Sequence, residues 1–183
     1  IPYMILGLDI STSIVGATIL SDNGEVKETF AWDMRNKNHF PDIFTKYNHV
    51  QGEFLDMLTS RDIEYIFVEQ SLQMFRSGFS SAKTLSTLAS FNGVVSYLCY
   101  REFGIKPEYI SASSARKACG ITISRGTKAK EQVIKFLLDN EAKFIVEYTK
   151  SGNLKPKYYD IADSIVIAKA GYELVQQRED SNS

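Results

Sequence analysis

The feature that most constrains the fold is an apolar run, residues 5–8, that ends on an acid, Asp9, and is followed at once by small hydroxyl residues. A carboxylate at the end of a buried strand is unfavourable unless something pairs with it. A second apolar run, residues 65–68, ends in the same way on Glu69. The two runs predict strands of one sheet whose terminal carboxylates lie at the same edge.

Two further acids follow the same logic near the end of the chain. Asp160 and Asp163 stand three residues apart in an apolar stretch, which places both on one face of a helix. Each acid alone also fits a structural role, for example a turn at Asp9 or a favourable helix-dipole contact at Asp160. All four together favour one pocket that holds divalent metal, for which carboxylate oxygens are suitable ligands.

The composition is that of a globular protein. Of 183 residues, 44% are hydrophobic and 23% are charged, which predicts a single domain over residues 1–183. Residues 178–183, at the end of the chain, are predicted to form a disordered tail. No apolar run is long enough to cross a bilayer and no signal peptide is visible. Two cysteines, Cys99 and Cys119, do not make a disulfide framework, which indicates a reducing compartment.

Hydrophobic periodicity and turn residues predict a mixed α/β fold. A turn at residues 21–24 makes the first strands antiparallel, and the helix before the fourth strand makes that strand parallel to the first. We expect a mixed five-stranded sheet with helices on both faces, and a flexible connection at 140–157. The predicted strands are 4–9, 14–20, 25–32, 63–69 and 107–111, and the predicted helices are about 40–58, 81–103, 113–120 with Ser113 as cap, 128–138 with Thr127 as cap, and 158–177.

Basic residues concentrate in one segment although the chain has a net charge of −1. Residues 112–137 carry six basic side chains against one acid, a distribution that suits contact with a phosphate backbone. Lysines at the start of the helix from 128 would meet a phosphate there, although a solvated role is equally compatible with the sequence. The six are Arg116, Lys117, Arg125, Lys128, Lys130 and Lys135.

The segment after Glu69 combines apolar residues with a cation. Phe75 and Phe79 flank Arg76 in a stretch without helical or strand periodicity. The two aromatic rings either fold back into the core or insert into a base stack, as apolar wedges do in proteins that distort DNA.

Four segments resemble motifs of the RuvC-type Holliday junction resolvases of the RNase H-like superfamily. They occur in the same order as in that family, between Met4 and Tyr172. The segments are 6–16 (LGLDISTSIVG), 68–71 (VEQS), 127–133 (TKAKEQV) and 160–165 (DIADSI).

The resemblance implies an RNase H-like fold and a metal-dependent endonuclease that cuts a four-way DNA junction symmetrically. Asp9, Glu69, Asp160 and Asp163 would hold two Mg²⁺ ions, with Mn²⁺ as a substitute and no small-molecule cofactor. Lys130 would be the catalytic lysine.

The DNA contacts that the resemblance implies extend over several elements. Lys128 lies close to Lys130, and a second basic position falls on Arg116 or Lys117. Phe75 or Phe79 would be the stacking aromatic. The insert from Glu141 to Pro156 is longer than the family pattern, so junction selectivity does not follow from the motifs.

The resemblance also implies a homodimer in a reducing, DNA-containing compartment, cytoplasmic or organellar, without membrane attachment. A symmetric junction requires two equal sites, which a two-fold interface supplies. The apolar face of the helix 81–103 is the predicted contact surface, unless it packs only on its own sheet. That face carries Leu85, Leu88, Phe91, Val95 and Leu98.

Other functions remain open from the sequence. A broader branched-DNA or flap endonuclease and a YqgF-type RNA-processing nuclease would share the fold. An actin-like ATPase also places an acid after its first strand, but 183 residues leave little room for a second domain. A non-catalytic binding module is the last alternative, and four intact acids argue against it.

Overall fold

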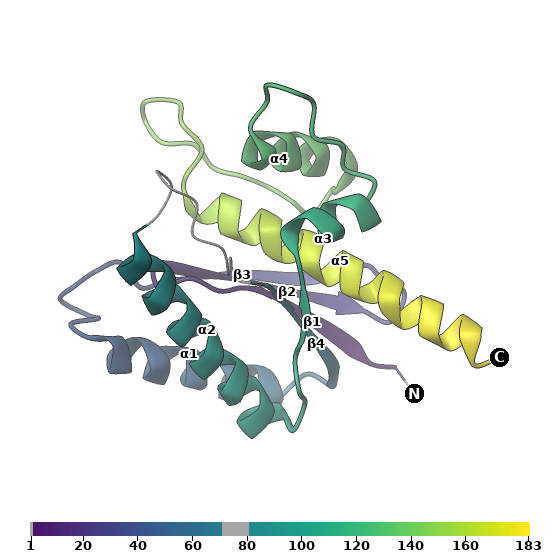
Figure 1. Cartoon of the computed structure of the whole chain (residues 1–183), viewed down its shortest axis with the longest axis horizontal. Coiled ribbons are helices and arrows are strands. Elements are labelled where there is room, and N and C mark those ends of the chain that lie inside the picture. The colour runs from purple at the N-terminus through teal and green to yellow at the C-terminus, as the bar shows by residue number, and fades with distance from the viewer. Residues whose placement is uncertain (1, 71–80) are drawn as a thin grey trace.

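The structure is a computed structural model that describes residues 2–70 and 81–183. Within those residues the chain forms five strands and five helices (Figure 1). They are β1 (Met4–Asp9), β2 (Ile14–Ser21), β3 (Val26–Asp33), α1 (Ile43–Leu58), β4 (Ile63–Glu69), α2 (Ala82–Phe103), β5 (Glu108–Ile110), α3 (Ala112–Ala118), α4 (Ala129–Asn140) and α5 (Lys157–Ser181).

The strands form one mixed sheet in the order β3-β2-β1-β4-β5. The pairs β1–β2 and β2–β3 are antiparallel, whereas β4 is parallel to β1 and β5 is parallel to β4. Helix α1 carries the chain back across the sheet after β3, so β4 starts at the same end of the sheet as β1 and runs parallel to it. The predicted topology is therefore confirmed.

Helices cover both faces of the sheet, as predicted (Figure 1). On one face, Leu6 and Leu8 of β1 pack with residues of α1 and α2 in one buried cluster. On the other face, Ile5 and Phe67 belong to a cluster with α3, α4 and α5. Central strands that are buried on both faces read as continuous apolar runs, which is why β1 and β4 lack polar alternation.

Two predicted helix caps are wrong by a few residues. Ser111 rather than Ser113 caps α3. The hydroxyl of Thr127 donates to the carbonyl of Ser124 instead of capping α4, whose N-cap is Lys128. Hydroxyl residues favour both caps and turns, so the sequence alone does not fix which of several neighbours takes the cap.

Helix α5 continues to Ser181, so the prediction of a disordered tail is wrong for residues 178–181. The Arg178 guanidinium holds the Glu108 carboxylate through two bonds of 3.0 Å. The Tyr3 hydroxyl donates to the carboxylate of Glu179, the residue that follows Arg178. These contacts tie the last turns of α5 to β5 and to the first residues of the chain.

The connection between α4 and α5 is also more ordered than predicted. Phe144 is buried, with its ring 6.3 Å from that of Tyr158. Tyr148 pairs with Leu154 in an isolated antiparallel bridge. Residues 145–155 thus form a short folded hairpin, named here the α4–α5 hairpin. Within residues 2–70 and 81–183, no helix has both the length and the apolar character of a membrane span.

Candidate metal centre

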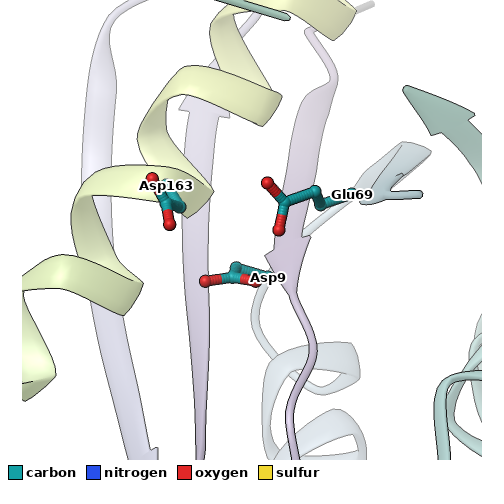
Figure 2. A group of neighbouring side chains, drawn as sticks. All are labelled: Asp9, Glu69 and Asp163. Atoms are coloured by element: carbon teal, nitrogen blue, oxygen red, sulfur yellow. The ribbon is translucent and has the colours of Figure 1, made fainter. Parts of the chain in front are cut away.

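Three acids from distant parts of the chain meet at one edge of the sheet. Leu8 and Val68 are register partners in the parallel strands β1 and β4, so the next residues, Asp9 and Glu69, leave the sheet side by side. Asp163 on α5 approaches from the other side (Figure 2). Carboxylate oxygens of all three lie within 4.8 Å of one another, a spacing that lets one cation contact them all.

The fourth predicted acid, Asp160, lies beside this cluster rather than in it. It stands one turn before Asp163 on α5, and its charge contributes to raising the pKa of both Asp9 and Asp163. The charges of Lys130 and Arg35 act on Asp160 in the opposite direction. Asp160 is thus coupled electrostatically both to the acids of the cluster and to these two basic side chains.

The electrostatics of the cluster favour a cation. Burial, and then the neighbouring Glu69 and Asp163, raise the pKa of Asp9 well above its ordinary value. Burial, and then the charges of Glu69 and Asp160, raise the pKa of Asp163 to about 7. Burial raises the pKa of Asp160 to about 6. Buried carboxylates this close repel one another unless a proton or a cation intervenes, and an all-oxygen donor set suits Mg²⁺, Mn²⁺ or Ca²⁺.

This crowding predicts an unusual pH dependence of stability in the metal-free protein. The pKa of Asp163 is near 4 in the unfolded chain and about 7 in the folded protein. At a pH between these two values, the folded protein holds a proton on Asp163 that the unfolded chain releases. The free energy of unfolding should therefore fall as pH rises through this window, by on the order of 2 kcal/mol from pH 5 to pH 8. Thermal unfolding in EDTA across that range measures it.

The same experiment has an internal control. Asp163→Asn removes the titrating group, so its unfolding temperature in EDTA should vary less with pH and exceed that of the unmodified protein at pH 8. Added Mg²⁺ should stabilise the unmodified protein more at pH 8 than at pH 5, because protons compete with the cation. A free energy of unfolding that rises from pH 5 to pH 8 in EDTA would contradict the raised pKa of Asp163 in the acidic cluster.

Helix α5 is held close to the sheet at the point where it presents its acids. Gly16 of β2 is the register partner of Asp9, and a Cβ added at Gly16 would lie 2.1 Å from the backbone oxygen of Asp160. One turn further, the Thr18 and Ser164 hydroxyls are 2.7 Å apart and buried. Ser164 donates its own proton to a helix carbonyl, so Thr18 is the donor between them. These contacts set the height of Asp163 above β1.

Two predicted basic residues act on the cluster. The charge of Lys130 lowers the pKa of both Asp160 and Asp163, and that of Arg116 lowers the pKa of Asp163. The Lys130 ammonium lies 5.8 Å from the ring centroid of Tyr159. Lys117, Arg125 and Lys128 are exposed on α3, the following loop and the start of α4. Phe75, Arg76 and Phe79 lie outside the described residues, so their DNA-contact roles stay predictions.

Sequence reasoning missed three neighbours of the centre. Arg35 forms a bidentate ion pair with Asp33 and its charge reaches Asp160. Lys46 donates to the backbone carbonyl of Thr12, in the turn that follows Asp9. The pairing of Gly16 with Asp9 could have been predicted from the register of the β1–β2 hairpin. The positions of Arg35 and Lys46 could not, because they depend on tertiary packing.

The predicted dimer surface on α2 is wrong for three of its five residues. Phe91, Val95 and Leu98 are buried in the core shared with α1 and the sheet. Leu85 and Leu88, nearer the start of the helix, are half-buried. The side of α2 that remains exposed carries Tyr97 and Tyr100.

Comparison with known proteins identifies the architecture. No protein-family model matches the chain, and no curated protein matches its sequence. Among solved structures, Thermus thermophilus RuvC in complex with a Holliday junction substrate matches with a TM-score of 0.64 at 13% identity over 96% of each chain. The chain has the RuvC fold. The predicted RNase H-like fold class is thereby confirmed.

Two further structures with the RuvC fold match over similar lengths. A second Thermus thermophilus RuvC structure has a TM-score of 0.60 at 14% identity, over 95% of this chain and 96% of that one. The yeast mitochondrial Holliday junction resolvase Ydc2 has a TM-score of 0.62 at 17% identity, over 96% of this chain and 80% of that one. At these identities the RuvC fold is shared, while function must be argued from the site.

Proposed function

We propose that the protein is a metal-dependent endonuclease that resolves four-way DNA junctions by paired, symmetric nicks. The observation that carries this proposal is the convergence of Asp9, Glu69 and Asp163 oxygens within 4.8 Å at the end of β1 and β4. Support comes from the RuvC fold, which is shared with a junction-bound RuvC and with a mitochondrial resolvase. Compatible cellular sites are reducing compartments that contain DNA.

Each residue has a defined role in this proposal. Asp9, Glu69 and Asp163 would hold one cation, and Asp160 would contribute to holding a second. Mg²⁺ held there, or Mn²⁺ in its place, supplies activation of a water and charge neutralisation at phosphorus. Lys130 stabilises negative charge that develops on the scissile phosphate, because its ammonium already acts electrostatically on the same acids.

Basic residues along α3, the following loop and α4 would position the DNA. Arg116, Lys117, Arg125 and Lys128 contact phosphates, which fixes orientation without reading sequence. Arg76 and a stacking ring of Phe75 or Phe79 act at the junction centre. A second protomer supplies the symmetric second cut. Replacement of these lysines and arginines should weaken binding and reduce its salt dependence.

Cleavage of synthetic substrates tests the proposal directly. With Mg²⁺, the protein should nick a mobile four-way junction at two symmetry-related positions, and EDTA should abolish the nicks. A flap, a linear duplex and a structured RNA of equal length are the comparison substrates. Preferential cutting of the flap would favour a broader branched-DNA nuclease, and preferential cutting of the RNA would favour an RNA-processing role. Absence of any metal-dependent cutting would overturn the nuclease assignment.

A further inference from the structure

A groove of about 240 Å³ opens between α4, the α4–α5 hairpin and the start of α5, and the acids of the metal centre do not line it. Its wall on α4 consists of two apolar residues, one lysine and two acids. Tyr148 and Leu154 close it from the hairpin, where they form the bridge that folds the segment. We name it the aromatic groove. Its principal lining residues are Ile134, Lys135, Leu138, Tyr148, Leu154 and Tyr159.

The groove exposes apolar surface that the fold itself does not use. Tyr148 is 56% exposed and Leu138 is 45% exposed, and both face the groove. The hairpin that carries Tyr148 is held in shape by its backbone bridge and by an ion pair of 2.6 Å between Lys155 and Glu147. An exposed aromatic side chain on an ordered support beside a concavity is typical of a binding site.

The aromatic groove lies next to Asp160, the acid beside the metal centre. Tyr159 lines the groove, and the next residue, Asp160, flanks the three-acid cluster. Lys130 connects the two regions, because its ammonium lies over the Tyr159 ring while its charge acts on Asp160 and Asp163. Figure 1 shows the hairpin and α4 above the end of α5 that carries these acids. A strand held at the centre would continue past the groove.

The charges that line and flank the groove bear on the kind of ligand it takes. Residues 142–157, which flank the groove, carry four lysines, of which Lys155 is paired with the one glutamate, and Lys135 lines the groove itself. Glu131 and Asp139 also line it, and these carboxylates repel phosphate but accept hydrogen bonds from base amino groups. The groove is smaller than the 300–1,000 Å³ or so of drug-sized pockets. These features suit a single base inside and its backbone on the lysines.

We propose that the aromatic groove binds one unpaired nucleotide of the strand that passes the metal centre, with its base stacked against Tyr148. This inference rests on the proposed nuclease function for its substrate. Stacking on an aromatic ring tolerates any base, whereas Glu131 and Asp139 favour a base with an exocyclic amine. The groove thereby contributes to the choice of the nucleotide beside the cut.

Fluorescent junctions test the proposal. A series of four-way junctions carries 2-aminopurine at successive positions near the crossover, and binding is measured in EDTA so that no strand is cut. One position should change its fluorescence on binding, and Tyr148→Ala should abolish that change and weaken binding by about fivefold to thirtyfold. Tyr148→Phe should retain both, because the ring rather than the hydroxyl stacks.

The matched control is Tyr109→Ala, at a tyrosine on β5 that is 50% exposed, which should leave both signals unchanged. The slope of affinity against salt should stay the same in Tyr148→Ala, since no cation is removed. If the unmodified protein nicks junctions while Tyr148→Ala retains full affinity and an unchanged fluorescence profile, the inference is overturned and the nuclease function stands. If no nicks form at all, the EDTA binding assay still decides whether the groove holds a base.

Discussion

The Asp163→Asn protein is expected to bind a four-way junction at least as tightly as the unmodified protein and to cut it at least about 1,000-fold more slowly, a barrier increase of about 4 kcal/mol. Asp163 shares the 4.8 Å cluster with Asp9 and Glu69, and an amide cannot supply the negative charge that the cation requires. The same change at Asp9 should act in the same way.

Binding should survive because the substitution removes a negative charge from the surface that faces phosphates. The folded protein should also be more stable at pH 8 without metal, since burial and the charges of Glu69 and Asp160 hold the pKa of Asp163 near 7. Loss of cutting in a protein that is more stable and binds normally separates a chemical role from a folding defect. A gel assay of binding beside single-turnover cleavage, with thermal unfolding, gives all three quantities.

Asp180→Asn is the matched control for this substitution. Asp180 is exposed on the same helix, 17 residues and so about 25 Å further along its axis. The chemical change is identical, but the lost charge is far from the acidic cluster. Cutting at the normal rate is expected. If Asp163→Asn also cut at the normal rate, the assignment of the metal centre would be wrong.

The acidic cluster could be predicted because it depends on strand ends and helical spacing. Apolar runs that end on Asp9 and Glu69 fix the edge of the sheet, and parallel pairing brings those ends together. The spacing of Asp160 and Asp163 places both on one side of α5, but not at equal depth. Only tertiary packing decides that Asp163 reaches the cluster while Asp160 stays beside it.

The surfaces of the helices were less predictable for a physical reason. Periodicity in α2 shows that Phe91, Val95 and Leu98 share an apolar face, but it does not show whether the sheet or a second protomer covers that face. Here α1 and the sheet cover it. The aromatic groove was missed because a polar segment with irregular apolar residues lacks any period. Tyr148 acquires its position from one backbone bridge inside the hairpin.

Gly16→Ala is expected to damage cutting more than its size suggests, because the position holds α5 against the sheet. The new Cβ would lie 2.1 Å from the Asp160 carbonyl oxygen and 2.4 Å from its carbon, and both are backbone atoms that no rotamer change can move. The start of α5 must shift, which carries Asp160 and Asp163 away from Asp9. We expect a loss of about 1–3 kcal/mol in stability and at least about 100-fold in cleavage rate.

Two other glycines separate the positional effect from the loss of stability. Gly7→Ala presses on Ala168 of α5 at 2.6 Å, more than one turn beyond the acids, so it should lower stability with a smaller effect on cutting by the folded fraction. Gly52 of α1 has open space around it, and Gly52→Ala should raise stability by about 0.5–1 kcal/mol without affecting cutting. Across the three variants, the single-turnover cutting rate should therefore not follow the free energy of unfolding, because only Gly16→Ala should slow cutting strongly. The decisive comparison is between Gly16→Ala and Gly7→Ala at equal concentrations of folded protein. If Gly16→Ala cut no more slowly, the distance of α5 from β2 would not determine the activity of the metal centre.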